Sequence, residues 1–194
     1  MTEGLGLGQL AGKLLAEHVA VIPRIAAEEG LTAAEFDRIE RRFGFAFADD
    51  HRAFLETVLP VGPRWPDWRH GDEAQLCQQL AWPVEGTLFD VEHADVWPAD
   101  WGPRRTLLAE ALTVARDRLA TVPQLVPVYS HRYLPSGRAA AGHPVLSVYQ
   151  TDIIYYGTDL LDYLYQEFRV GPGIEREDPR WQPRATVPFW RDFI

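Results

Sequence analysis

The 194-residue sequence is poor in cysteine, lysine and long apolar runs. Cys77 is its only cysteine, which excludes an internal disulfide and a cysteine-rich zinc site. No apolar run approaches the roughly 20 residues that a membrane-spanning helix needs. The opening MTEGLGLG carries an acid instead of the basic region of a signal peptide, and no apolar block follows it. We therefore expect a cytoplasmic protein with no membrane partner.

Sequence motifs for catalysis and metal binding are also missing. There is no G-x-S-x-G nucleophile turn, no Walker loop and no G-x-G-x-x-G after a strand. None of the six histidines has another histidine, aspartate or glutamate at a spacing typical of a zinc site. Cys77 has no basic neighbour in the sequence to activate it, so we expect a buried or inert thiol. We therefore predict no enzymatic activity, no cofactor and no bound metal.

Acidic residues outnumber basic ones. The sequence has 28 acidic and 19 basic residues, a formal net charge of −9, and Lys13 is the single lysine. A nucleic-acid-binding surface needs a basic face to neutralise phosphates, so this balance argues against a nucleic-acid partner. It favours a basic protein partner, because complementary charges speed encounter and suppress wrong partners. The alternative is that mild acidity only keeps the protein in solution.

The first 30 residues predict a helical extension. Leucines and other apolar residues recur near helical spacing, and Pro23 is expected to kink or break the helix. The glycine-rich GLGLG at residues 4–8 follows no strand, so we interpret it as a flexible end.

Two further helices are predicted before residue 60. Thr32 and Glu35 have the spacing of a capping box, in which each side chain satisfies the other residue's backbone amide. Gly44 is expected to end that helix. Asp49 or Asp50 can cap the next, shorter helix.

The middle of the chain is harder to assign. Prolines, glycines and two tryptophans predict a structured loop over residues 61–71. A short helix is predicted over residues 72–81. Residues 82–102 mix tryptophan, proline and acids, and only one short strand near Thr87–Val91 is expected there. A clear amphipathic helix follows over residues 103–123.

The last third of the chain predicts strands, a helix and a tail. Short runs of β-branched and aromatic residues predict three strands, at residues 125–129, 145–150 and 152–156. Thr158 or Asp159 can cap a last helix. The tail of residues 171–194 ends in ATVPFWRDFI, which would be a liability if exposed, so we expect it to pack back on the domain.

These elements predict an α+β fold in which helices pack on a twisted, mainly antiparallel sheet. The length of the chain is typical of one domain, and no linker divides it, so we expect a single domain over residues 1–194. The sequence predicts no particular oligomeric state.

One polar group stands beside the predicted strands. His131, Arg132 and Tyr133 follow one strand, and Asp152 and Tyr156 belong to another. Such a group can form a small-ligand pocket or an internal hydrogen-bonded brace. We favour the brace, in which Arg132 and Asp152 satisfy each other.

Two blocks of this sequence resemble the SUKH superfamily. The first comprises the predicted helix with Phe36 and Phe43-Gly44-Phe45, followed by Phe54-Leu55. The second, more specific block comprises Pro144–Val148, Asp152–Gly157 and Leu160–Phe168. The resemblance implies an α+β fold and a non-catalytic role, because many bacterial members are immunity proteins that neutralise a toxin and yeast members regulate cell-wall synthesis. It leaves the Trp-rich middle of the chain unmatched.

A loop in that unmatched middle is our predicted contact region. Tryptophans ringed by acids are typical of a binding hot spot for a basic partner, and the alternative is that both tryptophans belong to the core. The predicted contact residues are Trp65, Asp67, Trp68, Asp72 and Glu73.

Three functions follow as hypotheses. The first is an immunity-type inhibitor that covers a basic toxin domain. The second is a regulatory or scaffold protein of the same fold. The third is a small-ligand binder that uses His131, Arg132 and Asp152.

Overall fold

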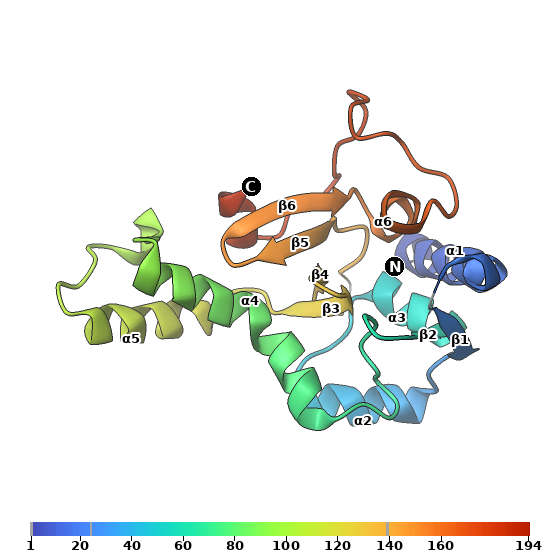
Figure 1. Ribbon diagram of the computed structural model, residues 1–194, viewed down its shortest axis with the longest axis horizontal. Coiled ribbons are helices and arrows are strands. Elements are labelled where there is room, and N and C mark those ends of the chain that lie inside the picture. Colours follow the sequence, from blue (N-terminus) through green and yellow to red (C-terminus); the bar gives the residue numbers. More distant parts are fainter. Residues whose placement is uncertain (1, 24, 139) are drawn as a thin grey trace.

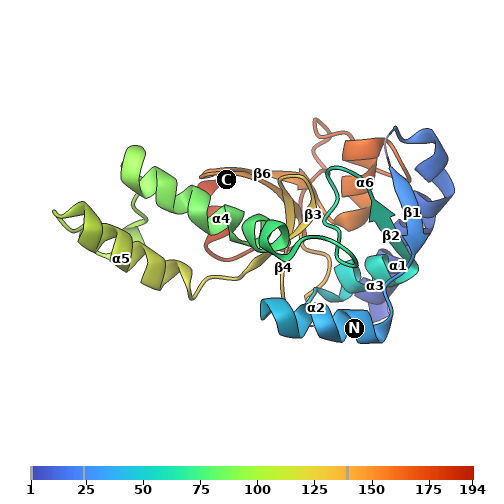
Figure 2. The same cartoon turned by 60° about the horizontal axis from the view of Figure 1, so that its bottom comes forward.

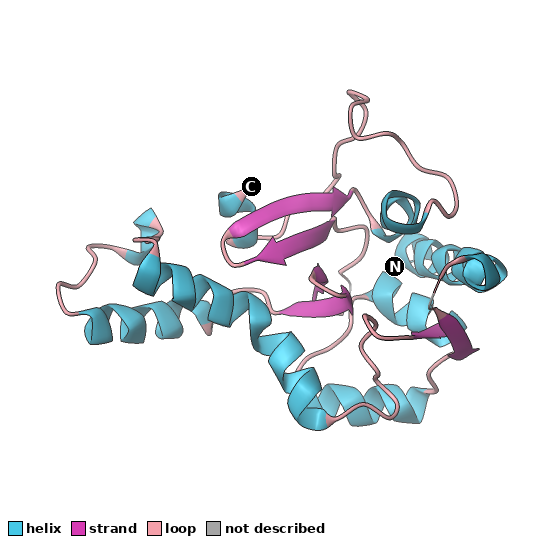
Figure 3. Ribbon diagram, in the orientation of Figure 1, coloured by secondary structure: helices cyan, strands magenta, loops and turns pink. Residues whose placement is uncertain are grey.

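The computed structural model describes residues 2–23, 25–138 and 140–194. The described residues form six α-helices and six strands, and the strands make a two-stranded and a four-stranded antiparallel sheet (Figure 3). The predicted α+β class is confirmed. Within the described residues, no helix combines the length and apolar character needed to cross a membrane.

The N-terminal helix packs closely on the third helix. Helix α1 (Thr2–His18) includes the GLGLG segment, so the prediction of a flexible end is wrong. A Cβ added at Gly8 would lie 2.1 Å from the carbonyl oxygen of Asp50 in α3 (Asp49–Thr57), and one added at Gly12 would lie 2.7 Å from the Thr57 side chain. The glycines are therefore needed because two helix backbones approach there.

The second helix and the small sheet follow. A one-turn 3₁₀ helix (Val19–Val21) leads to β1 (Ala26–Glu29), which pairs antiparallel with β2 (Val58–Val61). Helix α2 (Ala33–Phe43) begins at Thr32, where the predicted capping box is present, and ends at Gly44 with a left-handed φ of 72°.

A long helix occupies the region where we expected a short helix and a strand. Helix α4 runs from Glu73 to His93, so the predicted strand at Thr87–Val91 is wrong. Pro83 lies inside this helix, and it has no N–H to donate to the carbonyl of Gln79. The hydroxyl of Tyr133 donates to that carbonyl instead, at 2.9 Å. A contact from the sheet therefore satisfies the acceptor that the proline leaves free.

Helix α4 and helix α5 (Leu108–Leu119) form a hairpin that projects from the rest of the molecule (Figures 1 and 2). A 3₁₀ turn (Ala99–Trp101) lies between them. The hairpin has its own small core, made by Leu88, Val91, Trp101, Ala115 and Leu119.

The four-stranded sheet has the order β3 (Leu125–Tyr129), β4 (Arg132–Pro135), β5 (Val145–Tyr149) and β6 (Asp152–Gly157). One face joins the main core with α6 (Leu160–Phe168), whose N-cap is Asp159. The end of the chain covers the other face with Val187 and with the 3₁₀ helix Trp190–Phe193, which lies beside β6 (Figure 1). The Trp190 indole donates to the carbonyl of Pro123 at 2.7 Å.

Candidate functional site

The two tryptophans of the predicted contact loop are buried. Trp65 is 5% exposed and Trp68 is 3% exposed. The Trp68 ring packs edge-on against Phe47, with the ring centroids 5.3 Å apart. The Trp65 ring stacks on Phe168 of α6 at 5.8 Å. Both tryptophans therefore belong to the core, which is the alternative we considered for them.

The acids of the same loop take part in local structure. Asp67 accepts a hydrogen bond from the backbone amide of His70 at 2.8 Å, and Asp72 caps α4 by accepting from the amide of Gln75 at 3.0 Å. Glu73 forms an ion pair with Arg42. Asp67, Asp72 and Glu73 are exposed, so the loop presents carboxylates without the exposed aromatic anchors that a hot spot needs.

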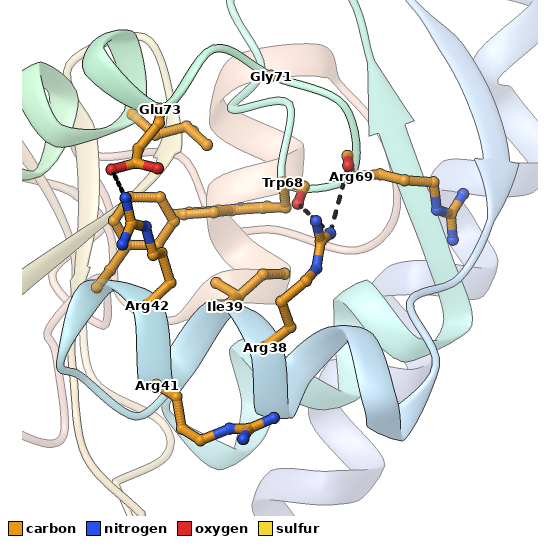
Figure 4. Close-up of a pocket in the computed structure, with 10 residues that line it drawn as sticks. Arg38, Ile39, Arg41, Arg42, Trp68, Arg69, Gly71 and Glu73 are labelled. Carbon is orange, nitrogen blue, oxygen red and sulfur yellow. Dashed lines mark hydrogen bonds and ion pairs between the residues drawn. The ribbon is translucent and has the colours of Figure 1, made fainter.

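Arginines from α2 hold this loop in place. A groove of about 520 Å³ lies between α2 and the loop, with Arg38 and Arg42 at its edges and Trp68 and Ile39 between them (Figure 4). Arg38 donates to the carbonyls of Trp68 at 3.4 Å and of Arg69 at 3.3 Å. The arginines of this groove therefore serve mainly to bind one part of the chain to another.

Arg69 extends away from the groove and joins the loop to the small sheet (Figure 4). Its guanidinium pairs with Glu35 at 2.6 Å and with Glu28 at 2.9 Å, and it also donates to the carbonyl of Gly30 at 3.1 Å. The hydrogen bond from Arg69 and the one from the Thr32 amide lower the pKa of Glu35 to about 2. Glu35 therefore stays ionised and ties the helix cap to the loop.

Arg132 forms an internal brace, but not with the partner we predicted. Its guanidinium pairs with Glu167 at 3.2 Å, donates to the hydroxyl of Ser147 at 2.9 Å and lies over the Tyr156 ring at 3.6 Å. Asp152 is exposed and lies opposite Tyr149, at the far end of β6. The prediction of an Arg132–Asp152 pair is therefore wrong.

The register of the sheet explains this difference. Arg132 is opposite Ser147, which is opposite Ile154, so the residue of β6 across from Arg132 is not Asp152. A β-bulge between Val145 and Leu146 shifts the pairing near the end of β6, where Tyr156 lies. Neither feature is encoded in a local motif.

His131 and Tyr133 lie in a different place from Arg132. They line a cleft of about 340 Å³ between the first half of α4 and the sheet. Strand alternation explains the separation, because residues on either side of Arg132 point to the opposite face of β4. The predicted polar group is therefore divided between a brace and a cleft. The cleft is lined by Gln75, Gln78, Gln79, Trp82, Ser130, His131, Tyr133 and Tyr149.

Among the described residues that line the cleft, none has a formally charged side chain. Burial, and then the nearby charges of Arg132 and Arg64, lower the pKa of His131, so its ring is neutral near pH 7. The hydroxyl of Ser130 lies 3.2 Å from Nδ1 of His131. The cleft is thus a neutral site in an acidic protein.

Two exposed aromatic rings form the edge of this cleft. Trp82 is 41% exposed and Tyr149 is 58% exposed, and their ring centroids lie 6.3 Å apart. The Trp82 indole donates to the carbonyl of Val148 at 3.3 Å, which fixes the ring. One turn further along α4, a Cβ added at Gly86 would lie 2.9 Å from Cα of Gln150, so the helix touches the β5–β6 turn there.

The exposed surface continues along α4. Phe89 lies seven residues after Trp82, on the same face of the helix, and is 48% exposed. Its ring stacks on that of His93. Glu85 and Glu92 follow Trp82 and Phe89 by three residues each and are exposed. We call Trp82, Glu85, Phe89, Glu92, Tyr149 and Asp152 the α4 face.

Sequence reasoning missed this surface for one reason. Reading residues 82–102 as loop and strand hid the seven-residue spacing of Trp82 and Phe89, which only a helix places on one side. Pro83 was the misleading signal, because a proline within a helical pattern usually marks its end.

Asp50 and His51 are titratable residues buried in the main core. Burial raises the pKa of Asp50 to about 6 and lowers that of His51 to about 3. Asp50 accepts hydrogen bonds from the amides of Gly142 at 2.7 Å and of His51 at 2.8 Å. Both are 1% exposed or less, so they lie outside any surface site. Elsewhere in the described residues, no cluster of three or more histidine, cysteine or acidic side chains could hold a metal ion.

Comparison with protein-family models, with curated proteins and with solved structures finds no significant match for this chain. The resemblance to the SUKH superfamily therefore stays a prediction.

Proposed function

We propose that this chain is a cytoplasmic, non-catalytic domain that binds a basic protein through the α4 face. The observation that carries this proposal is the pairing of exposed aromatic rings with carboxylates. Trp82, Phe89 and Tyr149 are all more than 40% exposed. An acid accompanies each of them, Glu85 and Glu92 on the helix and Asp152 across the β-turn.

Large aromatic side chains near the centre of an interface contribute most of the binding free energy in many complexes. Exposing three of them on one surface without a partner is unfavourable for a monomer, so their clustering supports a binding role. The hydrogen bond from Trp82 to the Val148 carbonyl also favours binding, since little side-chain entropy of Trp82 remains to be lost.

The charge around the α4 face indicates what kind of partner fits it. In the described part of the chain, Glu85, Glu92 and Asp152 take part in no ion pair. Residues 71–103 contain no arginine or lysine. They contain seven acidic residues, namely Asp72, Glu73, Glu85, Asp90, Glu92, Asp95 and Asp100. Glu73 pairs with Arg42, Asp95 pairs with Arg104 and Asp90 is buried, so a basic partner would meet unpaired carboxylates at Glu85, Glu92 and Asp152.

An immunity-type inhibitor is the specific role that we favour. The resemblance to the SUKH superfamily and the net charge of −9 both support a protein that covers a basic toxin domain. A regulatory or scaffold protein of the same fold is the alternative. A toxin-like gene adjacent to the coding sequence favours the inhibitor, and a solitary locus favours the regulator.

Co-expression tests the proposed inhibitor. The full chain should protect cells from the product of an adjacent toxin-like gene, and the double variant Trp82→Ala/Phe89→Ala should lose that protection. Asp67→Ala, in the exposed part of the 61–71 loop, is the matched control and should still protect. Protection by both variants, or by neither the variants nor the natural chain, would contradict the proposed function.

A small-ligand role in the cleft is the second candidate. The specific observation in its favour is the cleft of about 340 Å³, which Gln79, Trp82 and His131 help to line. Arg132 and Asp152, which we expected to join His131 in such a site, lie outside the cleft lining. A thermal-shift screen against metabolites would support this role if one compound raised the melting temperature and a Gln79→Leu variant abolished the rise.

A further inference from the structure

We propose that strand β6 pairs with β6 of a second copy of this chain, so that two four-stranded sheets join edge to edge. Strand β6 is the last strand in the order of the larger sheet, and its partner in that sheet, β5, lies on one side of it (Figure 1). The backbone N–H and C=O groups on its other side are therefore available to a further strand.

The free edge of β6 is open over residues 152–155. Within the described residues, no backbone–backbone hydrogen bond joins this stretch to any element other than β5. The C-terminal segment packs on one face of the sheet, against Ile153 and Tyr155. Arg176 covers the edge at Tyr156, whose carbonyl accepts from the guanidinium at 3.1 Å. The β-bulge also lies beyond residue 155, so residues 152–155 keep the regular pairing that a new strand can extend.

The residues of β6 do not protect this edge. The strand reads DIIYYG, which is rich in β-branched and aromatic residues and has no lysine, arginine or proline to discourage pairing. Ile154 at its centre is 44% exposed. The strand at the opposite edge, β3, carries Pro127 and buries residues 125–128. An open edge of the β6 kind favours association with another strand, so we looked to its charges for the identity of that strand.

The charges at the two ends of the edge fit a second copy. In antiparallel pairing centred on Ile154, Asp152 of each strand lies beside Tyr156 of the other, because residues equally far from the centre face each other. The guanidinium of Arg176 lies 4.1 Å from the centroid of the Tyr156 ring. In the part of the chain that the structure describes, neither Asp152 nor Arg176 takes part in an ion pair. The twofold pairing therefore brings an unpaired acid of each copy near an unpaired arginine of the other.

The centre of the same pairing is apolar. Ile154 of each copy lies opposite Ile154 of the other, which removes an exposed side chain of both from water. Strand pairing alone buries little surface, so we expect a dimer whose population rises with concentration and not a permanent one.

The first test is sedimentation equilibrium of the full chain over a range of concentrations. The natural chain should form dimers, and Ile154→Lys should weaken them at least about tenfold, because two lysines would then lie opposite each other at the centre of the interface. Leu107→Lys is the matched control, since Leu107 is an exposed apolar residue, 62% exposed, at the start of α5. It should change the dimer affinity by less than about twofold.

The second test reports the register of the pairing. Cys77, the single cysteine, is exposed, so it is first replaced by Cys77→Ser. Opposite residues of an antiparallel pair have Cα atoms about 4.5–5.5 Å apart, within the range that a disulfide spans. Ile154→Cys in this background should therefore give a disulfide-linked dimer on mild oxidation, and Leu107→Cys should stay largely monomeric.

Three results would overturn the inference. They are a natural chain that stays monomeric up to about 1 mM, a dimer that Ile154→Lys leaves intact, and equal cross-linking of the two cysteine variants. No partner protein enters either test, so the outcome is independent of the proposed function.

Discussion

Two tryptophan-containing regions of this protein differ completely in their surroundings. In the 61–71 loop, Trp65 and Trp68 are at most 5% exposed and pack in the main core. On α4 and at the end of β5, Trp82 and Tyr149 are at least 41% exposed. Both regions combine aromatic rings with acids in the sequence. Composition alone therefore does not distinguish exposed aromatic side chains from buried ones.

The difference comes from what holds each region in place. Side chains hold the loop, because Arg38 of α2 donates to its backbone, its own Arg69 pairs with Glu35, and its tryptophan rings pack in the main core. Helix α4 is held on the sheet by the Gln79 carbonyl, which accepts from Tyr133, by the close approach at Gly86, and by the Trp82 indole, which donates to the Val148 carbonyl. These contacts leave the rings of Trp82 and Phe89 partly exposed.

The largest expected effect compares a buried tryptophan, Trp68, with an exposed one, Trp82. Trp68→Ala should lower the free energy of unfolding by about 3–5 kcal/mol, because it removes a buried ring from the core. Trp82→Ala should lower it by only about 1 kcal/mol, since the lost hydrogen bond to Val148 is modest and the ring is half exposed. Urea unfolding of both variants measures the difference. Equal losses would remove the distinction between the two regions.

The second prediction compares the brace with the exposed acid of the α4 face. Arg132→Met should lower the free energy of unfolding by about 3 kcal/mol, because it leaves Glu167 without its partner in a nearly buried site. Asp152→Asn should change it by less than about 0.5 kcal/mol, because Asp152 is exposed.

A double variant provides the control for the brace. Arg132→Met/Glu167→Gln should recover part of the loss seen in Arg132→Met, since it no longer leaves a charge unpaired. A double variant that is less stable than the single one would contradict an ion-pair role. The same urea titrations decide the outcome.

The third prediction compares two glycines of α1, one closely packed and one open to solvent. Gly8→Ala should destabilise the protein by about 1–3 kcal/mol, because the new Cβ would meet the Asp50 carbonyl oxygen. Gly6→Ala should stabilise it by about 0.5–1 kcal/mol, because nothing in the described part of the chain lies within 4 Å of the new Cβ and alanine favours the helix. Thermal unfolding of the two variants provides a matched pair. Similar shifts in both would contradict the close packing of α1 on α3.

The smallest effect tests whether the core beneath the 61–71 loop excludes water. The His51 ring packs on Phe47, which contacts Trp68, and burial lowers the pKa of His51 from 6.5 to about 3. Because its pKa is lowered in the folded protein, neutral His51 contributes to the free energy of unfolding in full above pH 6.5. That contribution is lost as the pH falls towards 3. Asp50 acts in the opposite sense, because its pKa is raised from 3.8 to about 6 and its contribution is lost as the pH rises through that value.

His51→Phe removes one of these two opposing contributions. The difference in the free energy of unfolding between the natural chain and His51→Phe should therefore grow by about 1 kcal/mol per pH unit from pH 4 to 6. Urea unfolding at pH 4, 5 and 6 measures this slope. A difference that stays constant with pH would show that His51 titrates normally and that the core is open to water.

Local rules predicted several helix caps and the strands β3, β5 and β6, but they missed β1, β2 and β4. The capping box at Thr32 and Glu35 and the cap at Asp159 are present, as are strands close to the three expected ranges. These features depend on neighbouring residues in the chain, so their chemistry is visible in the sequence.

Features that depend on distant partners were not predictable. The helical state of Pro83 depends on Tyr133, 50 residues later, which satisfies the carbonyl left free. The partner of Arg132 depends on the register of the sheet and on the position of α6, so Glu167 could not be chosen over Asp152 from spacing. The α4 face was missed for the same reason, since it exists only when residues 82–93 are helical.

The most direct test of the account takes the product of any toxin-like gene found adjacent to the coding sequence and measures its affinity for the full chain by titration calorimetry. Trp82→Ala/Phe89→Ala should weaken binding at least a hundredfold, which corresponds to about 2.7 kcal/mol at two hot-spot positions. Asp67→Ala in the 61–71 loop should change the affinity by less than about twofold. An unchanged affinity in the double variant, together with a large loss in Asp67→Ala, would contradict the central claim and return the binding site to the loop.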